Sequence, residues 1–358
     1  MIIDLATVTD NKNFFLRNIW YYALPGEQLK PGAMVAKKFL GEPVLLARTR
    51  EGKVFALRDI CPHRAVPLSC GRFDGNEVEC CYHGWRFDSN GRCTDIPALV
   101  EDQELDFSRF RVKQYPVREL QGNIWIYMAD KDKVDPPTPE MEIPQVPYFG
   151  DRTYNLLQRL HFPCFVDHAV VGLMDPAHSP YVHRAWWWQL NRPLVEEIKT
   201  FDPSPYGFTM RRHKIPAVPR AYRIFGGGEP ETEIAFYLPG VRIEHLIVGK
   251  HNVCNLTAVT PISETETEVH TMLYWHTPWL NLLKPFIQPL ARNFLDQDRQ
   301  VVIKQQIGLQ YNPSLMLIKD ADTQARWYYQ LKTEFARATT EGRPFVNPVK
   351  EQVLRWRS

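Results

Sequence analysis

Two short segments, each with one cysteine next to one histidine, constrain this chain more than any other feature. They read Cys61-Pro62-His63 and Cys80-Cys81-Tyr82-His83. Sixteen residues separate His63 from Cys80, which is enough for a pair of strands to bring the two loops together. Thiols and imidazoles at such density are typical of a metal-binding protein. The pattern therefore predicts a metal site in the first third of the chain.

The composition agrees with a metal site and not with a disulfide framework. The chain of 358 residues has seven cysteines, an odd number, and five of them lie between positions 61 and 93. We find no signal-peptide pattern at the N-terminus and no apolar stretch long enough to cross a bilayer. We therefore expect a soluble, cytoplasmic protein. A net charge of +2 predicts neither nucleic acid nor a membrane as its partner.

Two thiolates and two imidazoles in this order fit a Rieske [2Fe–2S] cluster, in which the cysteines bind one iron and the histidines the other. Two alternatives stay open. One is zinc, although zinc fingers place their cysteines together first and their histidines later. The other is that ordinary buried cysteines lie near surface histidines by chance. Chemistry alone also leaves open whether Cys80 or Cys81 is the second thiolate.

At these loops the chain resembles Rieske proteins, whose loops read Cys-x-His and Cys-x-x-His, the latter followed by Gly-Trp. The resemblance implies four cluster ligands, namely Cys61, His63, Cys80 and His83. Respiratory and photosynthetic Rieske proteins have an extra cysteine in each loop, and the two are joined as a disulfide. Val66 and Tyr82 occupy those positions here. This difference favours the ferredoxin and oxygenase branch of the Rieske proteins.

The order of expected elements predicts two domains and an α+β fold. Strand-like runs at 44–46, 54–57, 85–87 and 124–127 indicate an antiparallel β domain over residues 1–130, and Asn90-Gly91 predicts a hairpin turn. A proline-rich linker follows at 131–150. Residues 151–358 form the second domain, with a helix from about Phe165, strand-like runs at 233–238, 242–248, 255–261 and 268–274, and a long helix that starts near 285–289 and passes Ile307.

A second set of potential ligands lies in this second domain. Asp175, His178 and His183 are close in sequence, and two histidines with one carboxylate can form a facial iron site that leaves positions open for O₂ and substrate. A helical turn would place Asp175 beside His178. Asp298 lies in the middle of the apolar face of the expected long helix, whereas Asp296 points to the opposite side. The alternatives are histidines with structural roles and a buried salt bridge at Asp298.

These residues resemble Asp-x-x-His-x₄-His and the distant helical aspartate of Rieske non-haem iron oxygenase α subunits, and the similarity covers nearly the whole chain. The resemblance implies that His178, His183 and Asp298 bind a mononuclear Fe²⁺. It implies that Asp175 is an electron-transfer bridge to a Rieske histidine of the next subunit in a homotrimer. It also implies a helix-grip (Bet v 1/START-like) antiparallel sheet. One departure is Gly172, where many relatives have an amide side chain.

The implied function is that of the terminal component of a multicomponent oxygenase. With O₂ as co-substrate, it would hydroxylate or oxidatively O- or N-demethylate an aromatic or polycyclic compound, as in the single-component vanillate and dicamba O-demethylase branch. Electrons would come from NAD(P)H only through a separate reductase or ferredoxin. Trp186-Trp187-Trp188 is expected to pack or to line the pocket, and the loop 223–228 to cover it. The alternative functions are a Rieske electron-transfer protein and a non-catalytic binding protein.

Overall fold

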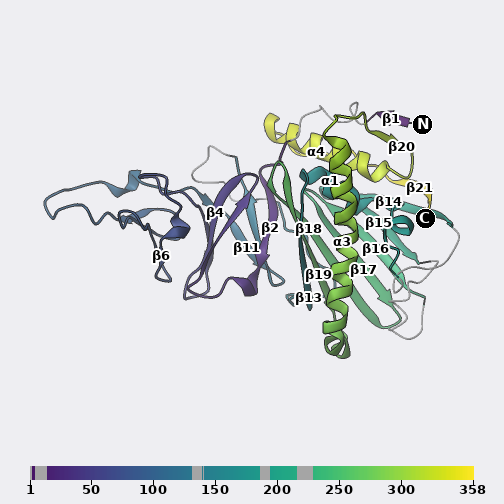
Figure 1. Ribbon diagram of the computed structural model, residues 1–358, viewed down its shortest axis with the longest axis horizontal. Coiled ribbons are helices and arrows are strands. Elements are labelled where there is room, and N and C mark those ends of the chain that lie inside the picture. The colour runs from purple at the N-terminus through teal and green to yellow at the C-terminus, as the bar shows by residue number, and fades with distance from the viewer. Residues whose placement is uncertain (1, 5–13, 131–138, 140, 186–193, 216–228) are drawn as a thin grey trace. The chain divides into compact units, whose positions relative to one another are not determined.

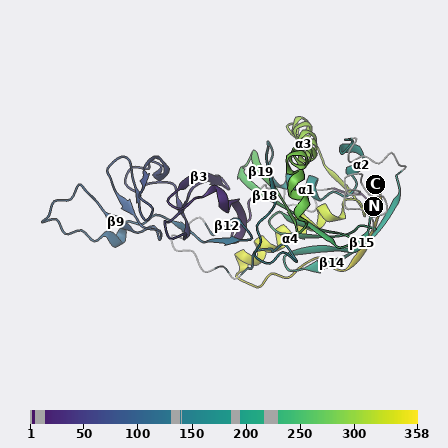
Figure 2. The same ribbon diagram turned by 90° about the horizontal axis from the view of Figure 1, so that it is seen from below.

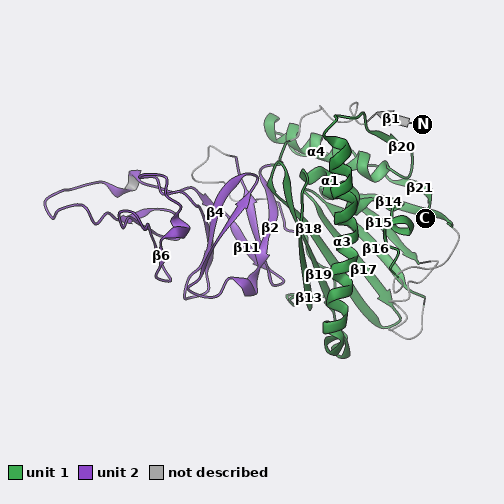
Figure 3. Ribbon diagram, in the orientation of Figure 1, with its two compact units in different colours: residues 1–16, 144–358 green, residues 17–143 purple. Residues whose placement is uncertain are grey.

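The computed structural model describes residues 2–4, 14–130, 139, 141–185, 194–215 and 229–358. The chain forms two compact units, one of residues 17–143 and one of residues 1–16 together with 144–358 (Figure 3). The sequence analysis assigned residues 1–16 to a domain 1–130, but these residues are grouped with residues 144–358. There, strand β1 (Ile2–Asp4) pairs with β20 (Met316–Ile318), and the Phe15 ring stacks on Phe165. The predicted linker 131–150 lies partly outside the described residues.

The unit of residues 17–143 contains three antiparallel sheets among its described residues. The first has the order β10 (Gln114–Tyr115), β5 (Val54–Arg58), β4 (Glu42–Arg48), β3 (Met34–Phe39). The second has the order β11 (Val117–Leu120), β12 (Asn123–Met128), β2 (Ile19–Pro25). The third has the order β6 (Arg72–Phe73), β7 (Val78–Glu79), β8 (Arg86–Phe87), β9 (Cys93–Asp95). Short 3₁₀ helices connect them, namely η2 (Gly26–Gln28), η3 (Leu68–Cys70) and η4 (Phe107–Arg109).

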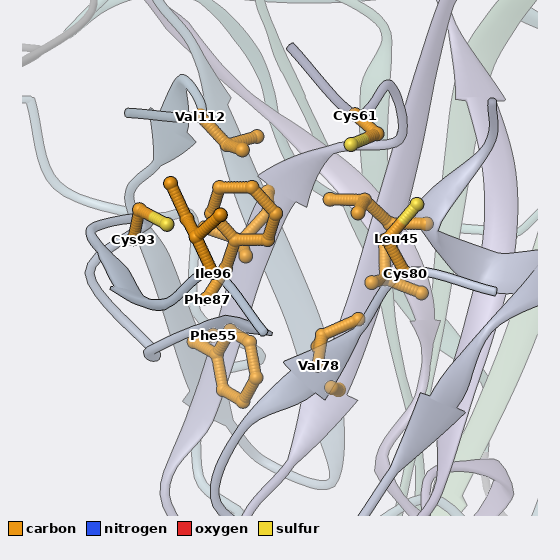
Figure 4. Close-up of a cluster of buried hydrophobic side chains, with 12 residues drawn as sticks. Leu45, Phe55, Cys61, Val78, Cys80, Phe87, Cys93, Ile96 and Val112 are labelled. Atoms are coloured by element: carbon orange, nitrogen blue, oxygen red, sulfur yellow. The ribbon is translucent and has the colours of Figure 1, made fainter. Parts of the chain in front are cut away.

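A continuous apolar core joins the first and third of these sheets. Leu45 and Phe55 come from the first sheet and Val78 and Phe87 from the third, and all four are fully buried (Figure 4). Alternation along the strands produces this core, because every second side chain points to the same face of a sheet. Cys61 and Cys80 lie at one end of the cluster, and Cys93 lies at the other (Figure 4). The core therefore packs against the two cysteine loops at that end.

The other unit is built on one antiparallel sheet of eight strands. Its order is β13 (Leu156–Phe162), β19 (Glu266–Trp275), β18 (His251–Ser263), β17 (Val241–Val248), β16 (Glu231–Tyr237), β15 (Gly207–Lys214), β14 (Glu196–Ser204), β21 (Gln352–Arg357). The helices are α1 (Val166–Met174), α2 (Ser179–Val182), η6 (Pro278–Leu283), α3 (Lys284–Leu309) and α4 (Thr323–Glu341).

Helix α3 lies across one face of this sheet (Figures 1 and 2). Ile287 and Ala291 of α3 pack on Leu156 and Trp275 of the sheet, and Gln158 donates to the carbonyl of Gln288 (2.8 Å). The strand register places Phe201 and Phe208 on the face of the sheet that α3 covers. Both rings contact Trp327 of α4 there. A sheet that buries one face under helices is the expected outcome for strands with one apolar side.

The predicted α+β class is confirmed, with mostly antiparallel sheets. All eight predicted strands lie within or next to observed strands, and both predicted helices are present as α1 and α3. The Trp186-Trp187-Trp188 run and the loop 223–228 lie outside the described residues, so their expected roles stay predictions. Among the described helices, none is both long enough and apolar enough to cross a membrane.

Candidate metal centres

The two cysteine loops share one backbone hydrogen-bond pattern, although their cysteine–histidine spacings differ. In each loop the cysteine N–H donates to the carbonyl five residues later, and the cysteine carbonyl accepts from the N–H four residues later. These bonds of 2.8–3.0 Å link Cys61 to Val66 and Ala65, and Cys80 to Trp85 and Gly84. Both fourth residues have a positive φ, 58° and 72°. Cys61 and Cys80 are therefore equivalent positions, which supports Cys80 and not its exposed neighbour Cys81 as the second ligand.

The donors are paired by type, as a cluster with two irons requires. Cys61 and Cys80 are both buried and adjacent (Figure 4), and burial, together with the nearby Cys80, raises the pKa of Cys61 to about 11. Two thiolates at this position therefore need the positive charge of a metal. The imidazole rings of His63 and His83 lie 4.5 Å apart between centroids. Two sulfur donors together and two nitrogen donors together fit a [2Fe–2S] cluster.

Trp85 fixes the more exposed histidine of this pair. Its indole ring stacks on His63, with 4.7 Å between centroids and 9° between planes, and is itself packed edge-on against Phe110. Slight desolvation and the charge of His83 lower the pKa of His63. A neutral imidazole is the form that binds a metal. The sequence contained Trp85 as part of the Gly-Trp motif, but it did not reveal the stack.

The second candidate centre is in the C-terminal unit, where three predicted ligands come together. His178 immediately precedes α2, His183 immediately follows it, and Asp298 lies on the buried side of α3. One donor atom of each residue lies within 4.8 Å of the other two. The predicted burial of Asp298 is confirmed, and Asp296 pairs instead with Arg299 (2.6 Å).

The distances among the three donors suit one metal ion. The Nε2 atoms of His178 and His183 are 3.2 Å apart, and each is 3.4 Å from Oδ1 of Asp298. Ligand atoms about 2.1 Å from a first-row metal are separated by roughly 3.0–3.4 Å when they subtend roughly 90–110°. Three donors on one side leave the other side open, as in a facial site with two histidines and one carboxylate. The donor set therefore fits mononuclear iron.

The electrostatics of the site distinguish its two histidines. Burial lowers the pKa of His183, so this imidazole is neutral and ready to bind a metal. Burial also acts to lower the pKa of His178, but the hydrogen bond and charge of Asp298 outweigh it and raise this pKa. A cation bound at Nε2 takes the place of that proton. Metal binding at this site therefore releases protons.

Asp175 lies beside the site, but not on the helical turn that the sequence predicted. Helix α1 ends at Met174, and Asp175 has extended backbone angles (φ −61°, ψ 120°). The following residue, Pro176, disfavours a helical conformation for Asp175. The carboxylate accepts from Ala177 N (2.7 Å) and lies 3.8 Å from Nδ1 of His178, and burial raises its pKa. A Cβ at Gly172 would meet only Val302, at 4.0 Å, so this position has room for a side chain.

Two residues near Asp298 on α3 contact His183, and the sequence analysis predicted neither contact. Gln297 Oε1 lies 3.0 Å from Nδ1 of His183, and Phe294 stacks on the same imidazole with 3.7 Å between centroids. The only signal in the sequence was their position one and four residues before Asp298. Helical geometry places such residues on the same or an adjoining side of the helix, but it does not reveal their partner.

Two family models match the chain. The first describes a Rieske [2Fe–2S] domain and matches residues 19–116, and the second describes a vanillate O-demethylase oxygenase C-terminal domain and matches residues 172–333. Each match lies within one of the two compact units. The first match decides between the alternatives for the cysteine loops in favour of the [2Fe–2S] cluster over zinc.

Among curated proteins, the 4β-methylsterol monooxygenase of Methylococcus capsulatus is 34% identical over 51% of this chain and 47% of its own length. The oxygenase component of dicamba O-demethylase from Stenotrophomonas maltophilia is 35% identical over 48% of each chain. The matched part thus spans about half the length of these relatives. The crystal structure of dicamba monooxygenase bound to dicamba is similar over 90% of this chain and 99% of that one, with 25% identity and a TM-score of 0.71. The chain therefore combines a Rieske [2Fe–2S] domain with a domain of the vanillate O-demethylase oxygenase C-terminal family.

Proposed function

We propose that the chain is the terminal oxygenase component of a multicomponent system, in which it uses O₂ to hydroxylate or oxidatively demethylate an aromatic or polycyclic small molecule. The observation that carries the proposal is the convergence of His178, His183 and Asp298 on one point in a chain that also has a Rieske domain. The alternative of a Rieske electron carrier does not explain the second metal site. The alternative of a non-catalytic binding protein explains neither the cluster site nor the mononuclear site.

The proposed ligands are divided between the two units. Cys61, His63, Cys80 and His83 would hold the [2Fe–2S] cluster, and His178, His183 and Asp298 would hold Fe²⁺. When bound, the cluster supplies single electrons and the mononuclear iron activates O₂. The protein's own contribution is to keep the His183 imidazole neutral, to bring one carboxylate next to both histidines, and to leave one side of the site open for the substrate.

Asp175 would connect the two kinds of centre between neighbouring subunits. Its carboxylate lies near the free side of His178, at Nδ1, and it is partly exposed. We propose that it also accepts from a Rieske histidine of the next chain, where His63 is exposed. In this arrangement each chain supplies a carboxylate to one neighbour and a histidine to the other, so the chains form a closed ring. We propose three chains, as the resemblance to the Rieske oxygenases implies.

We propose that the electrons come from a separate reductase, directly or through a ferredoxin, because several relatives are named as one component of a larger oxygenase system. We place the enzyme in the cytoplasm. All seven cysteines are free in the structure, as expected in a reducing compartment.

The names of the relatives support the substrate class. They include oxygenase components that demethylate dicamba and 5,5′-dehydrodivanillate and one that acts on chloroacetanilides, besides the sterol monooxygenase. These are ring compounds, and the printed reactions remove O- or N-linked carbon groups from several of them. We therefore expect a substrate of this class. A screen of methoxylated and N-alkylated ring compounds with a surrogate reductase, scored by O₂ uptake coupled to product, would identify it.

Iron analysis tests the proposal without a known substrate. The wild-type chain should contain about three irons and two acid-labile sulfides, two of the irons in the cluster and one in the mononuclear site. Asp298→Asn should contain about two irons with unchanged sulfide, because a neutral amide is a poor replacement for the carboxylate ligand. Asp296→Asn is the matched control, and it should keep the third iron. A wild-type chain with only two irons would favour the electron-transfer alternative.

A further inference from the structure

One helix, α3, holds His183 on three sides. The Nε2 atom of this imidazole faces Asp298 at 3.4 Å, its Nδ1 atom lies 3.0 Å from Oε1 of Gln297, and its ring stacks on Phe294 with only 15° between the planes. His183 is almost completely buried, so these contacts leave it one orientation. His178 differs, because its Nδ1 atom is buried without a hydrogen bond.

We propose that Gln297 is a positioning residue that fixes the tautomer and the orientation of His183 for metal binding. The inference rests on the proposed iron site. A neutral imidazole has one N–H and one lone pair, and the hydrogen bond at one nitrogen decides which nitrogen is left to bind a metal. The Gln297 carbonyl oxygen accepts the Nδ1 proton of His183. The Nε2 lone pair is thereby directed at the point where Asp298 and His178 converge.

Asn293 fixes the direction of the Gln297 amide. Its Oδ1 accepts from Nε2 of Gln297 at 3.1 Å, one helical turn earlier on α3. With the NH₂ group engaged there, the oxygen of the Gln297 amide is the atom that faces His183. Asn293, Gln297 and His183 form a relay in which each acceptor orients the next group. A helix thus supplies both a ligand, Asp298, and the support for a second ligand from a different segment.

The choice of an amide has a chemical consequence. Metal-bound histidines usually donate their second N–H to a carboxylate, a carbonyl or water. The amide of Gln297 keeps the acceptor but adds no charge to a site that already has one carboxylate. A glutamate at this position would keep the acceptor and add a charge. Leucine, which has a similar size, would remove the acceptor and leave the Nδ1 proton of His183 buried and unpaired.

The test is the affinity of the full-length protein for Fe²⁺. Mononuclear iron is removed anaerobically with a chelator, and Fe²⁺ is then titrated back against a competing chelator, while the helical circular dichroism signal and its thermal unfolding report that the C-terminal unit is folded. Gln297→Leu should weaken Fe²⁺ binding about 10- to 100-fold, the range found when the partner of a metal-bound histidine is removed. Gln297→Glu should restore most of the affinity, because it restores the acceptor.

Gln300→Leu is the matched control, since Gln300 is exposed on the same helix and its amide donates to Asp296 (3.4 Å) and not to a ligand of the site. It should bind Fe²⁺ like wild type. Asn293→Leu changes an exposed position and should weaken binding in the same direction as Gln297→Leu, but less. If Gln297→Leu does not fold, Asn293→Leu and Gln297→Glu still decide the question.

Three results overturn the inference. Wild-type affinity in Gln297→Leu and Asn293→Leu would remove the positioning role and leave the iron site intact. Equal losses in Gln297→Leu and Gln297→Glu would show that an acceptor at this position does not restore Fe²⁺ binding. An Asp298→Asn variant that binds Fe²⁺ as tightly as wild type would instead reject the iron site itself, and the positioning role with it.

Discussion

At the scale of single residues, the Rieske unit depends on a few backbone positions that favour glycine. One of them is Gly91, in the hairpin between β8 and β9, which has φ 74°. The carboxylate of Asp88 accepts from Asn90 N and Arg92 N (2.8 and 2.9 Å) and closes this turn. A Cβ at Gly91 would lie 2.2 Å from the carbonyl oxygen of Val112, which accompanies a hydrogen bond of 2.7 Å from Val112 N to Gly91 O. The turn is therefore both left-handed and crowded.

Gly91→Ala should destabilise the Rieske unit by more than the left-handed conformation alone explains. Gly41→Ala is the matched control, because Gly41 has φ 80° but no atom within 4 Å of the added Cβ. We expect a loss of about 1 kcal/mol for Gly41→Ala from the backbone conformation. The clash in Gly91→Ala should add a further loss on the order of 1–3 kcal/mol. Urea unfolding followed through cluster absorbance and circular dichroism measures both, and equal losses would contradict the crowding argument.

At the scale of elements, the local patterns were visible in the sequence and the pairings between distant elements were not. The 3.6-residue period was sufficient to bury Asp298 and to turn Asp296 outward, because both facts belong to one helix. The break at Asp175 could have been predicted from Pro176. The contact between Gln297 and His183 could not, because it depends on where the segment after α1 places a residue 114 positions away from its partner.

A buried ion pair between α1 and α4 is the clearest example of such a pairing. Lys332 Nζ donates to both carboxylate oxygens of Asp167 at 2.7 Å, and Tyr328 donates to the same carboxylate. Lys332 also lies over the Phe165 ring (5.1 Å). The pair joins the start of α1, the helix that leads to Asp175 and His178, to the last helix of the chain. Nothing in the local sequence around Asp167 predicts it.

Asp167→Asn should cost about 3–5 kcal/mol of stability, because it leaves the charge of Lys332 buried and unpaired. The double variant Asp167→Leu with Lys332→Met should lose clearly less, since an apolar pair of similar size leaves no charge behind. Chemical unfolding of both variants and of Lys332→Met alone completes the comparison. A double variant that is less stable than either single variant would show that the pair stabilises the fold beyond the cost of burying its charges.

At the scale of the whole molecule, the proposed trimer predicts electron transfer between chains, and its test needs two different chains in one trimer. If Asp175 links His178 of one chain to a Rieske histidine of the next, electrons must cross between chains. A chain without a cluster, Cys80→Ser, and a chain without mononuclear iron, Asp298→Asn, should each be inactive alone. Co-expressed in equal amounts, they should form mixed trimers in which an intact iron site adjoins an intact cluster of a neighbour. About a quarter of wild-type activity per chain is then expected in a ring with random composition.

Asp175→Ala decides whether this recovery uses the proposed bridge. Placed in the Cys80→Ser chain, which supplies the working iron site, it should abolish the recovered activity, because His178 and Asp175 belong to the same chain. Placed in the Asp298→Asn chain, whose Asp175 adjoins a site without iron, it should leave the recovery unchanged. Product formation with the substrate found by screening is the measurement, and native mass spectrometry reports the composition of the trimers. Recovery that is lost in both combinations would assign Asp175 to stability, and recovery that survives in both would remove it from the electron path.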